Sequence, residues 1–221
     1  MCEFPNIQYV NNFVPLQGHD GNELPPSPRA MFSLLINKGI VDVNFLNNIN
    51  NMTQLEAEVF DLIDHYPENE ASLERIFHLI QIWGGRTGRG IYVNQDFHWE
   101  DVVQVYEPFI GLIRAFISID PLTLNLATGA VGAFRNDLHD IHYTGMGVAF
   151  ITKHVRFWMH RNLPEDMLPI YDSTFSEHIM QKGKTAQQKD LLNYWQGMVA
   201  KAAQEQVSLS SLERQLFNYY N

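Results

Sequence analysis

Apolar residues recur at helical spacing along most of this chain of 221 residues. Leu73, Ile76, Ile80 and Trp83 stand three or four positions apart and therefore share one face of a helix. Comparable patterns predict helices at about 28–37, 43–48, 53–65, 69–83, 99–118, 147–160, 172–180, 185–204 and from 210 onward. Residues 91–93 are the one stretch that suits a strand. The pattern predicts an all-α fold of about ten helices.

The chain divides into an irregular arm and one helical domain. Residues 1–27 are rich in Asn, Gly and Pro, which are typical of irregular structure. Residues 28–221 carry the periodic apolar positions, and their length suits a single domain. Within this domain Asp120 is expected to begin a short helix. Gly129 and Gly132 are expected to weaken the helical structure that leads to the hairpin, because glycine disfavours a helix.

Three helix starts match the capping-box pattern, in which a Ser or Thr is followed three residues later by Glu or Gln. The pairs are Thr53 with Glu56, Thr185 with Gln188, and Ser210 with Glu213. In this pattern the longer side chain binds the backbone of the first turn. Glu56 and Glu213 are therefore expected to cap the helices that they begin.

A glycine turn, Gly145-Met146-Gly147, separates two apolar helical patterns. Glycine tolerates positive φ, and the N–H groups at the start of the helix opened by Gly147 form an anion site. This layout, at about residues 134–160, is that of a helix-hairpin-helix, which grips the DNA backbone without reading its sequence. An ordinary corner between two packed helices explains the same residues, so the turn alone leaves both interpretations open.

Lys153 and Asp172 are the candidate reactive residues. Lys153 lies in an otherwise apolar helical run close to a helix start, and both conditions lower a lysine pKa and favour the nucleophilic neutral amine. Asp172 follows nineteen residues later, across a loop that can fold back and bring its carboxylate beside the amine. The structural alternatives are a solvated surface lysine and a helix N-cap aspartate.

The segments Gly145–Lys153 (GMGVAFITK) and Pro169–Asp172 (PIYD) resemble the bacterial 8-oxoguanine DNA glycosylase-fold proteins, which belong to the helix-hairpin-helix base-excision glycosylases. Residues 82–90 (IWGGRTGRG) look like a second shared patch, and the resemblance spans roughly residues 75–180. It implies a helical glycosylase fold, with Lys153 as the Schiff-base nucleophile and Asp172 as the assisting carboxylate. In the better-known eukaryotic members the lysine follows the second glycine almost directly. That place is held here by Ala149, so Lys153 lies one turn, about 6 Å, further along the helix.

Further residues are candidates for contacts with DNA. The loop at 84–90 holds four glycines with Arg86 and Arg89, and it is either a plain loop or a segment laid against a phosphate or a flipped nucleotide. Arg156, with the glycine turn, is a candidate for the DNA backbone. Candidates for a base pocket are Trp83, Trp158 and Phe217, each of which also suits core packing.

Charge and composition narrow the alternatives. The net charge is −10, which argues against indiscriminate binding of nucleic acid. Residues 135–162, however, carry four basic side chains against two acidic ones, a balance of +2. A single cysteine, Cys2, excludes an internal disulfide and a Cys₄ iron–sulfur cluster. No metal or other cofactor is called for, and no membrane span or signal peptide is evident, so a cytoplasmic location, at the nucleoid in a bacterium, is expected.

Three functions fit this sequence. The first is a DNA glycosylase with AP-lyase activity that flips an oxidised purine such as 8-oxoguanine out of double-stranded DNA and removes it by lysine Schiff-base chemistry. The second is a non-catalytic protein that binds the DNA backbone through the hairpin. The third is a protein-interaction module in which the hairpin serves only packing, and no feature identifies its partner.

Overall fold

The computed structural model describes residues 2–12, 14–21, 23–67, 70–84, 98–143 and 145–221. These residues form ten α-helices and no strand, which confirms the all-α prediction for this part of the chain. The helices are α1 (Pro26–Asn37), α2 (Val43–Asn47), α3 (Met52–His65), α4 (Glu70–Trp83), α6 (Trp99–Arg114), α7 (Pro121–Asp140), α8 (Val148–Met159), α9 (Ser173–His178), α10 (Gln188–Glu205) and α11 (Leu209–Tyr220). The strand expected at 91–93 lies outside the described residues.

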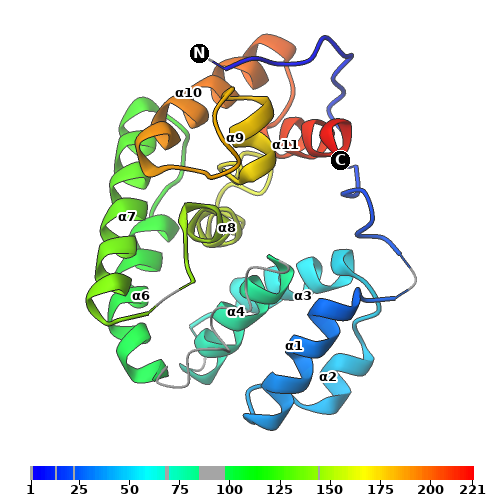
Figure 1. The fold of residues 1–221 in the computed structure, drawn as a ribbon, viewed down its shortest axis with the longest axis vertical. Coiled ribbons are helices and arrows are strands. Elements are labelled where there is room, and N and C mark those ends of the chain that lie inside the picture. The colour runs from blue at the N-terminus through cyan, green and yellow to red at the C-terminus, as the bar shows by residue number, and fades with distance from the viewer. Residues whose placement is uncertain (1, 13, 22, 68–69, 85–97, 144) are drawn as a thin grey trace.

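Helix α8 lies at the centre of the molecule. It contacts α3 and α4 on one side and α6 and α7 on another, and Figure 1 shows it almost end-on between these groups. Ten consecutive residues, 150–159, are buried, and so is Val148. A helix that is buried all round belongs to the core, so the charged groups that α8 carries must find partners inside the protein.

Helix α7 is longer than predicted. It continues without a break through Gly129 and Gly132 for 20 residues. The side chain of Gln188 from α10 lies 3.4 Å from where a side chain on Gly132 would begin, and its amide donates to the carbonyl of Thr128. The prediction of a short, loosened helix was wrong because the small residue allows α10 to approach α7 rather than ending the helix.

The capping-box predictions were also wrong. Asn51 caps α3 and Ser208 caps α11, each through a side-chain oxygen that accepts a backbone N–H three residues later. Helix α10 begins at Gln188 itself, without a side-chain cap. Glu56 and Glu213 are instead buried within their helices.

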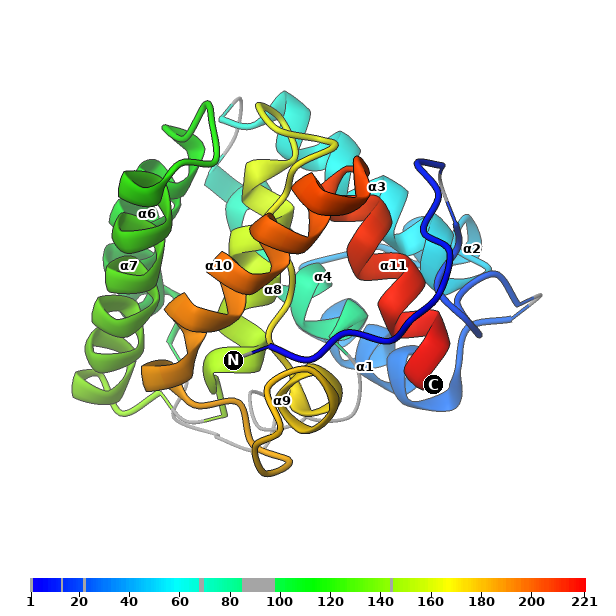
Figure 2. The ribbon, with the colours of Figure 1, turned by 90° about the horizontal axis from the view of Figure 1, so that it is seen from above.

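The N-terminal arm lies along α11. Figure 2 shows this extended segment following the last helix. Gln215 binds both backbone groups of Val10, and Asn218 accepts from the N–H of Gln17 while donating to the carbonyl of Pro15. These side-chain contacts hold the arm as a strap, so that residues 16–19 reach the site described next.

Candidate active site

A cavity of about 150 Å³ lies against α8. Its walls come from the N-terminal strap, the end of α4, α8, the loop before α9, α9 and α11. The lining residues are Leu16, His19, Trp83, Gly84, Lys153, Arg156, Ile170, Asp172, Phe175, Glu213 and Phe217. The cavity therefore brings together Lys153 and Asp172, which were proposed as reactive partners, with Trp83 and Phe217, which were proposed for a base pocket.

Lys153 is held at one end of this cavity. Its side chain is nearly buried, and its Nζ donates a hydrogen bond to the carbonyl of Gly84, 3.0 Å away. The Nζ also lies 4.3 Å from the ring centre of Phe150. A side chain on Gly84 would begin only 2.5 Å from that ring, so glycine permits the packing that places the lysine.

Burial changes the acid–base behaviour of Lys153. It lowers the pKa of the amine to about 8, while the negative charge of Asp172 acts in the opposite direction. A lysine with this pKa has a substantial neutral fraction near neutral pH, and the neutral amine is the nucleophilic form.

Asp172 caps helix α9 and faces the same cavity. Its Oδ1 accepts a hydrogen bond from the N–H of Phe175 at 3.1 Å, as expected for an N-cap. Burial raises the pKa of the carboxyl group, an effect opposed by this hydrogen bond and by Lys153. Lys153 and Asp172 form no ion pair within 4.0 Å. Both residues therefore line the same cavity without a direct ion pair between them.

Aromatic rings form part of the cavity wall. Trp83 and Phe217 contribute two of them, and His19 of the strap lies edge-on to both, with ring centres 5.6 Å and 6.4 Å away. Burial lowers the pKa of His19 and favours its neutral ring. The sequence analysis missed His19. The arm has no helical periodicity, so no pattern in it indicates that His19 lies beside Phe217, almost 200 positions later.

Arg156 lies beneath the cavity in a network of buried charges. Its Nε is 2.9 Å from Oε2 of Glu213, its Nη1 is 2.9 Å from Oε1 of Glu56, and Arg214 pairs with the other oxygen of Glu56. These carboxylates raise the pKa of Arg156. Arg156 is only 1% exposed, so the prediction that it binds the DNA backbone was wrong. It is nevertheless a residue of the cavity.

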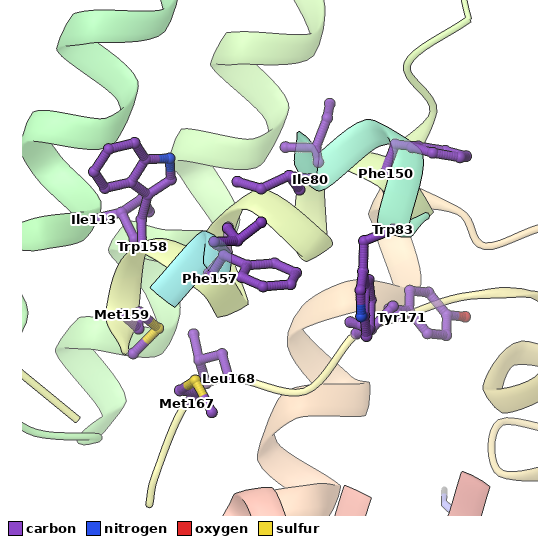
Figure 3. Packing of buried hydrophobic residues seen from close by; sticks show 14 of the residues in the cluster. Ile80, Trp83, Ile113, Phe150, Phe157, Trp158, Met159, Met167, Leu168 and Tyr171 are labelled. Atoms are coloured by element: carbon purple, nitrogen blue, oxygen red, sulfur yellow. The ribbon is translucent and has the colours of Figure 1, made fainter. Parts of the chain in front are cut away.

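Trp158 does not line this cavity. Its indole Nε1 donates to the hydroxyl oxygen of Tyr106 at 2.6 Å, and that hydroxyl also bonds His154. Figure 3 shows Trp158 beside Ile113 and well separated from Trp83. The base-pocket prediction for Trp158 was wrong because this hydrogen bond and its burial hold it between α8 and α6.

The glycine turn joins α7 to α8, which pack against each other. Gly145 has φ +99°, a conformation that favours glycine, whereas Gly147 has φ −81° and caps α8. Met146 between them is buried, so it packs inward and its side chain cannot contact DNA. Apart from the two adjoining residues, no heavy atom of the described part of the chain lies within 4 Å of where a side chain on Gly147 would begin.

The surface charge around the hairpin differs from the sequence count. Lys153 and Arg156 are buried, which leaves exposed Arg135 and Arg161 against exposed Asp137 and Asp140, a balance of 2 − 2 = 0 in place of +2. Arg86 and Arg89 lie outside the described residues. Among the described residues of 135–162, the exposed charges therefore balance, and this segment does not provide the positive surface that its sequence predicted.

The described residues contain no group of three His, Cys, Asp or Glu side chains placed to hold a metal ion. No helix among them combines the length and apolar character needed to cross a bilayer.

Comparisons with protein-family models, curated proteins and solved structures found no match.

Proposed function

We propose that the protein is a DNA glycosylase with AP-lyase activity, acting on an oxidised purine of the 8-oxoguanine type. The observation that carries this proposal is the shared cavity, in which a lysine with pKa about 8 and a carboxylate meet aromatic rings. Both reactive residues are those that the sequence resemblance implies. The cavity contains the combination that base removal requires: a nucleophile, an anionic group and apolar walls for a flat ring.

The chemistry begins with the neutral amine of Lys153. The amine attacks C1′ of the flipped nucleotide, the bond from C1′ to the base breaks, and the base leaves with the bonding electrons and takes up a proton. Loss of a proton from the attacking nitrogen and opening of the sugar ring give a C=N bond between Lys153 and C1′. Removal of a proton from C2′ then allows the 3′ phosphate to leave by β-elimination, which is the lyase step.

Asp172 has two compatible roles in this scheme. Its carboxylate stabilises the positive charge that develops on the sugar as the base departs. The hydrogen bond that this carboxylate accepts as the cap of α9 fixes its position. A carboxylate held by the first turn of a helix can keep its orientation while the bound nucleotide loses its base.

The hairpin supplies a route to DNA. Gly145 and Gly147 are exposed, and they and the first N–H groups of α8 suit a phosphate oxygen. With a net charge of −10, the protein is expected to bind DNA modestly and with clear sensitivity to salt.

Reductive trapping tests the proposal. Borohydride reduces the C=N bond, so the wild-type protein should become linked to a duplex that contains 8-oxoguanine. Lys153→Ala should abolish the linked species. Lys201→Ala is the matched control, because Lys201 is also partly buried but pairs with Glu205. Trapping that survives in Lys153→Ala would assign the chemistry to another amine.

The alternatives give different results in the same experiment. A non-catalytic DNA-binding protein would shift the duplex in a salt-dependent manner and form no linked species. A protein-interaction module would do neither. Binding should therefore be measured beside trapping over a range of salt concentrations.

A further inference from the structure

We propose that Arg156 determines the specificity of the cavity by donating a hydrogen bond to a carbonyl oxygen on the bound base. This inference deepens the proposed function and rests on it. It assigns to Arg156 the recognition of an oxopurine, a ring whose edge presents carbonyl acceptors, in place of the DNA-backbone contact that its burial rules out.

The hydrogen bonding of Arg156 carries this assignment. Arg156 lines the cavity, and two of its three guanidinium nitrogens, Nε and Nη1, are placed against Glu213 and Glu56. Nη1 and Nη2 are both buried, and neither makes a hydrogen bond to the described residues; Nη1 is ion-paired with Glu56, whereas Nη2 has no ion-pair partner within 4.0 Å among those residues. A buried donor without an acceptor costs free energy, and a ligand acceptor would remove that cost.

The surroundings of the guanidinium suit a flat ring. Its carbon lies 5.5 Å from the ring centre of Trp83, which also lines the cavity. Phe217 and His19 add further rings. A cavity of about 150 Å³ is of the size that accepts one aromatic ring such as benzene. The size of the cavity and the rings that line it therefore suit one flat ring, with Arg156 as a polar group in the wall.

The charge of Arg156 makes this contact selective. Two carboxylates hold the group protonated, and a guanidinium can donate hydrogen bonds but cannot accept them. A carbonyl oxygen of the base satisfies the free N–H, whereas an amino group in the same place leaves two donors facing each other. Recognition by a buried polar group of this kind rejects a ligand that lacks the acceptor.

The test measures coupling between Arg156 and the base carbonyls. Duplexes would contain 8-oxoguanine, guanine, which lacks the carbonyl at C8, or 8-oxo-2-aminopurine, which lacks the carbonyl at C6. Equilibrium binding would be measured in a Lys153→Gln background, so that no chemistry intervenes. Loss of one carbonyl should weaken binding about tenfold or more when Arg156 is present.

Arg156→Lys is the matched variant, because it keeps a positive charge between Glu56 and Glu213 but loses the planar donor array. In this variant the same loss of a carbonyl should change affinity by less than about threefold. If Arg156→Lys fails to fold, the ligand series on the Lys153→Gln protein alone decides, and equal affinity for all three duplexes overturns the inference.

Failure of this inference can be separated from failure of the proposed function. Efficient borohydride trapping by the wild-type protein, with no coupling between Arg156 and either carbonyl, would leave the glycosylase proposal intact and overturn the role of Arg156. Absence of trapping would instead remove the proposed function. Carbonyl-dependent binding with coupling to Arg156 supports the assignment of the acceptor site.

Discussion

Lys153 donates a hydrogen bond from Nζ to the main-chain carbonyl of Gly84, 3.0 Å away and 69 positions earlier in the chain. A carbonyl oxygen accepts from an ammonium group and from a neutral amine alike. The contact therefore positions the nitrogen without fixing its charge. Arg156, one turn further along α8, is held by two carboxylates that keep it protonated. The same helix thus carries one amine able to lose its proton and one fixed cation.

Trapping should depend on pH in the manner of this amine. The pKa of Lys153 is lowered to about 8, so the neutral fraction falls about tenfold for each pH unit below that value. Initial trapping rates should therefore rise about tenfold from about pH 6 to about pH 7 and level off above about pH 8. The measurement is the rate of covalent product formation at a saturating duplex concentration. A rate that is flat across this range would contradict a titrating lysine nucleophile.

Replacing Lys153 should stabilise the protein. Its folded-state pKa is lowered from 10.5 to about 8, so at neutral pH the folded protein carries the cost of a buried charge. That cost is fully present below about pH 8, and it disappears as the pH rises toward the unfolded value of 10.5. Lys153→Met, which retains most of the side-chain volume, should raise the free energy of unfolding at pH 7 by up to about 3 kcal/mol.

Urea unfolding of the two proteins at pH 7 and pH 10 measures this effect. The difference in unfolding free energy should shrink at the higher pH, because the lysine is then neutral in the folded state. A stabilised protein that no longer traps DNA would show that the site is maintained for chemistry at a cost in stability. A Lys153→Met protein less stable at pH 7 would show that packing of the lysine outweighs its burial cost.

Asp172 caps a helix and is proposed to assist the chemistry, and substitution by asparagine or by alanine separates these two roles. Asparagine caps a helix about as well as aspartate, whereas alanine does not. Asp172→Asn should therefore keep the stability within about 0.5 kcal/mol and reduce the trapping rate at least about tenfold. Asp172→Ala should reduce the rate similarly and also cost about 1 kcal/mol of stability. Trapping by Asp172→Asn at the wild-type rate would exclude a catalytic role for the carboxylate.

The contact between the hairpin and DNA is tested at Gly147. This residue has ordinary extended backbone and stands at the N-cap of α8 without a capping side chain, and no non-adjacent described residue would crowd a side chain placed there. Gly147→Asp and Gly147→Asn should therefore both be tolerated, since each offers a capping oxygen. The aspartate adds a negative charge where a phosphate would bind, so it alone should weaken DNA binding about tenfold or more.

Equilibrium binding to an undamaged duplex, beside thermal unfolding of both variants, makes this comparison. Equal affinity for DNA in the Asp and Asn variants would place the DNA contact elsewhere on the protein. Gly145 cannot serve this purpose, because its φ of +99° would strain any other residue and mix folding with binding.

The sequence was informative where local chemistry decides the outcome. The apolar run around Lys153 predicted a desolvated amine, and burial indeed lowers its pKa. The position of Asp172 before a helical pattern predicted an N-cap, and its side chain accepts the N–H of Phe175. Trp83 and Phe217, which the sequence made candidates for a base pocket, line the same cavity as Lys153 and Asp172, although the sequence could not distinguish a cavity wall from ordinary core packing.

Local sequence patterns could not predict which distant residues pair with one another. Glu56 and Glu213 matched capping boxes by spacing, yet both are buried partners of Arg156, which lies 57 positions from Glu213. Capping boxes involve neighbours within one turn, and the same residue types satisfy either arrangement. Two carboxylates from other helices compensate the charge of Arg156 in the interior, and no residue next to Arg156 in the sequence indicates them, so Arg156 was expected at the DNA backbone.

The buried charge network should be essential for folding. Glu56 pairs with Arg156 and Arg214, and these cations keep the pKa of Glu56 below its usual value of 4.5 despite burial. Glu56→Gln would leave the two arginines short of one negative charge in the interior, at an expected cost of about 3–5 kcal/mol. Glu58→Gln is the control on the same helix, since Glu58 forms a more exposed pair with Arg75 and should cost less than about 1 kcal/mol.

The pH dependence of unfolding gives a second test of the same network. Because the folded-state pKa of Glu56 is lowered, its contribution is present above pH 4.5 and is lost as the pH falls through the folded value. The wild-type protein should therefore lose stability steeply below pH 4.5, and the Glu56→Gln protein less steeply, as measured by urea unfolding from pH 7 downward. Equal acid sensitivity in the two proteins, or a Glu56→Gln protein as stable as Glu58→Gln, would mean that the arginines are compensated without Glu56.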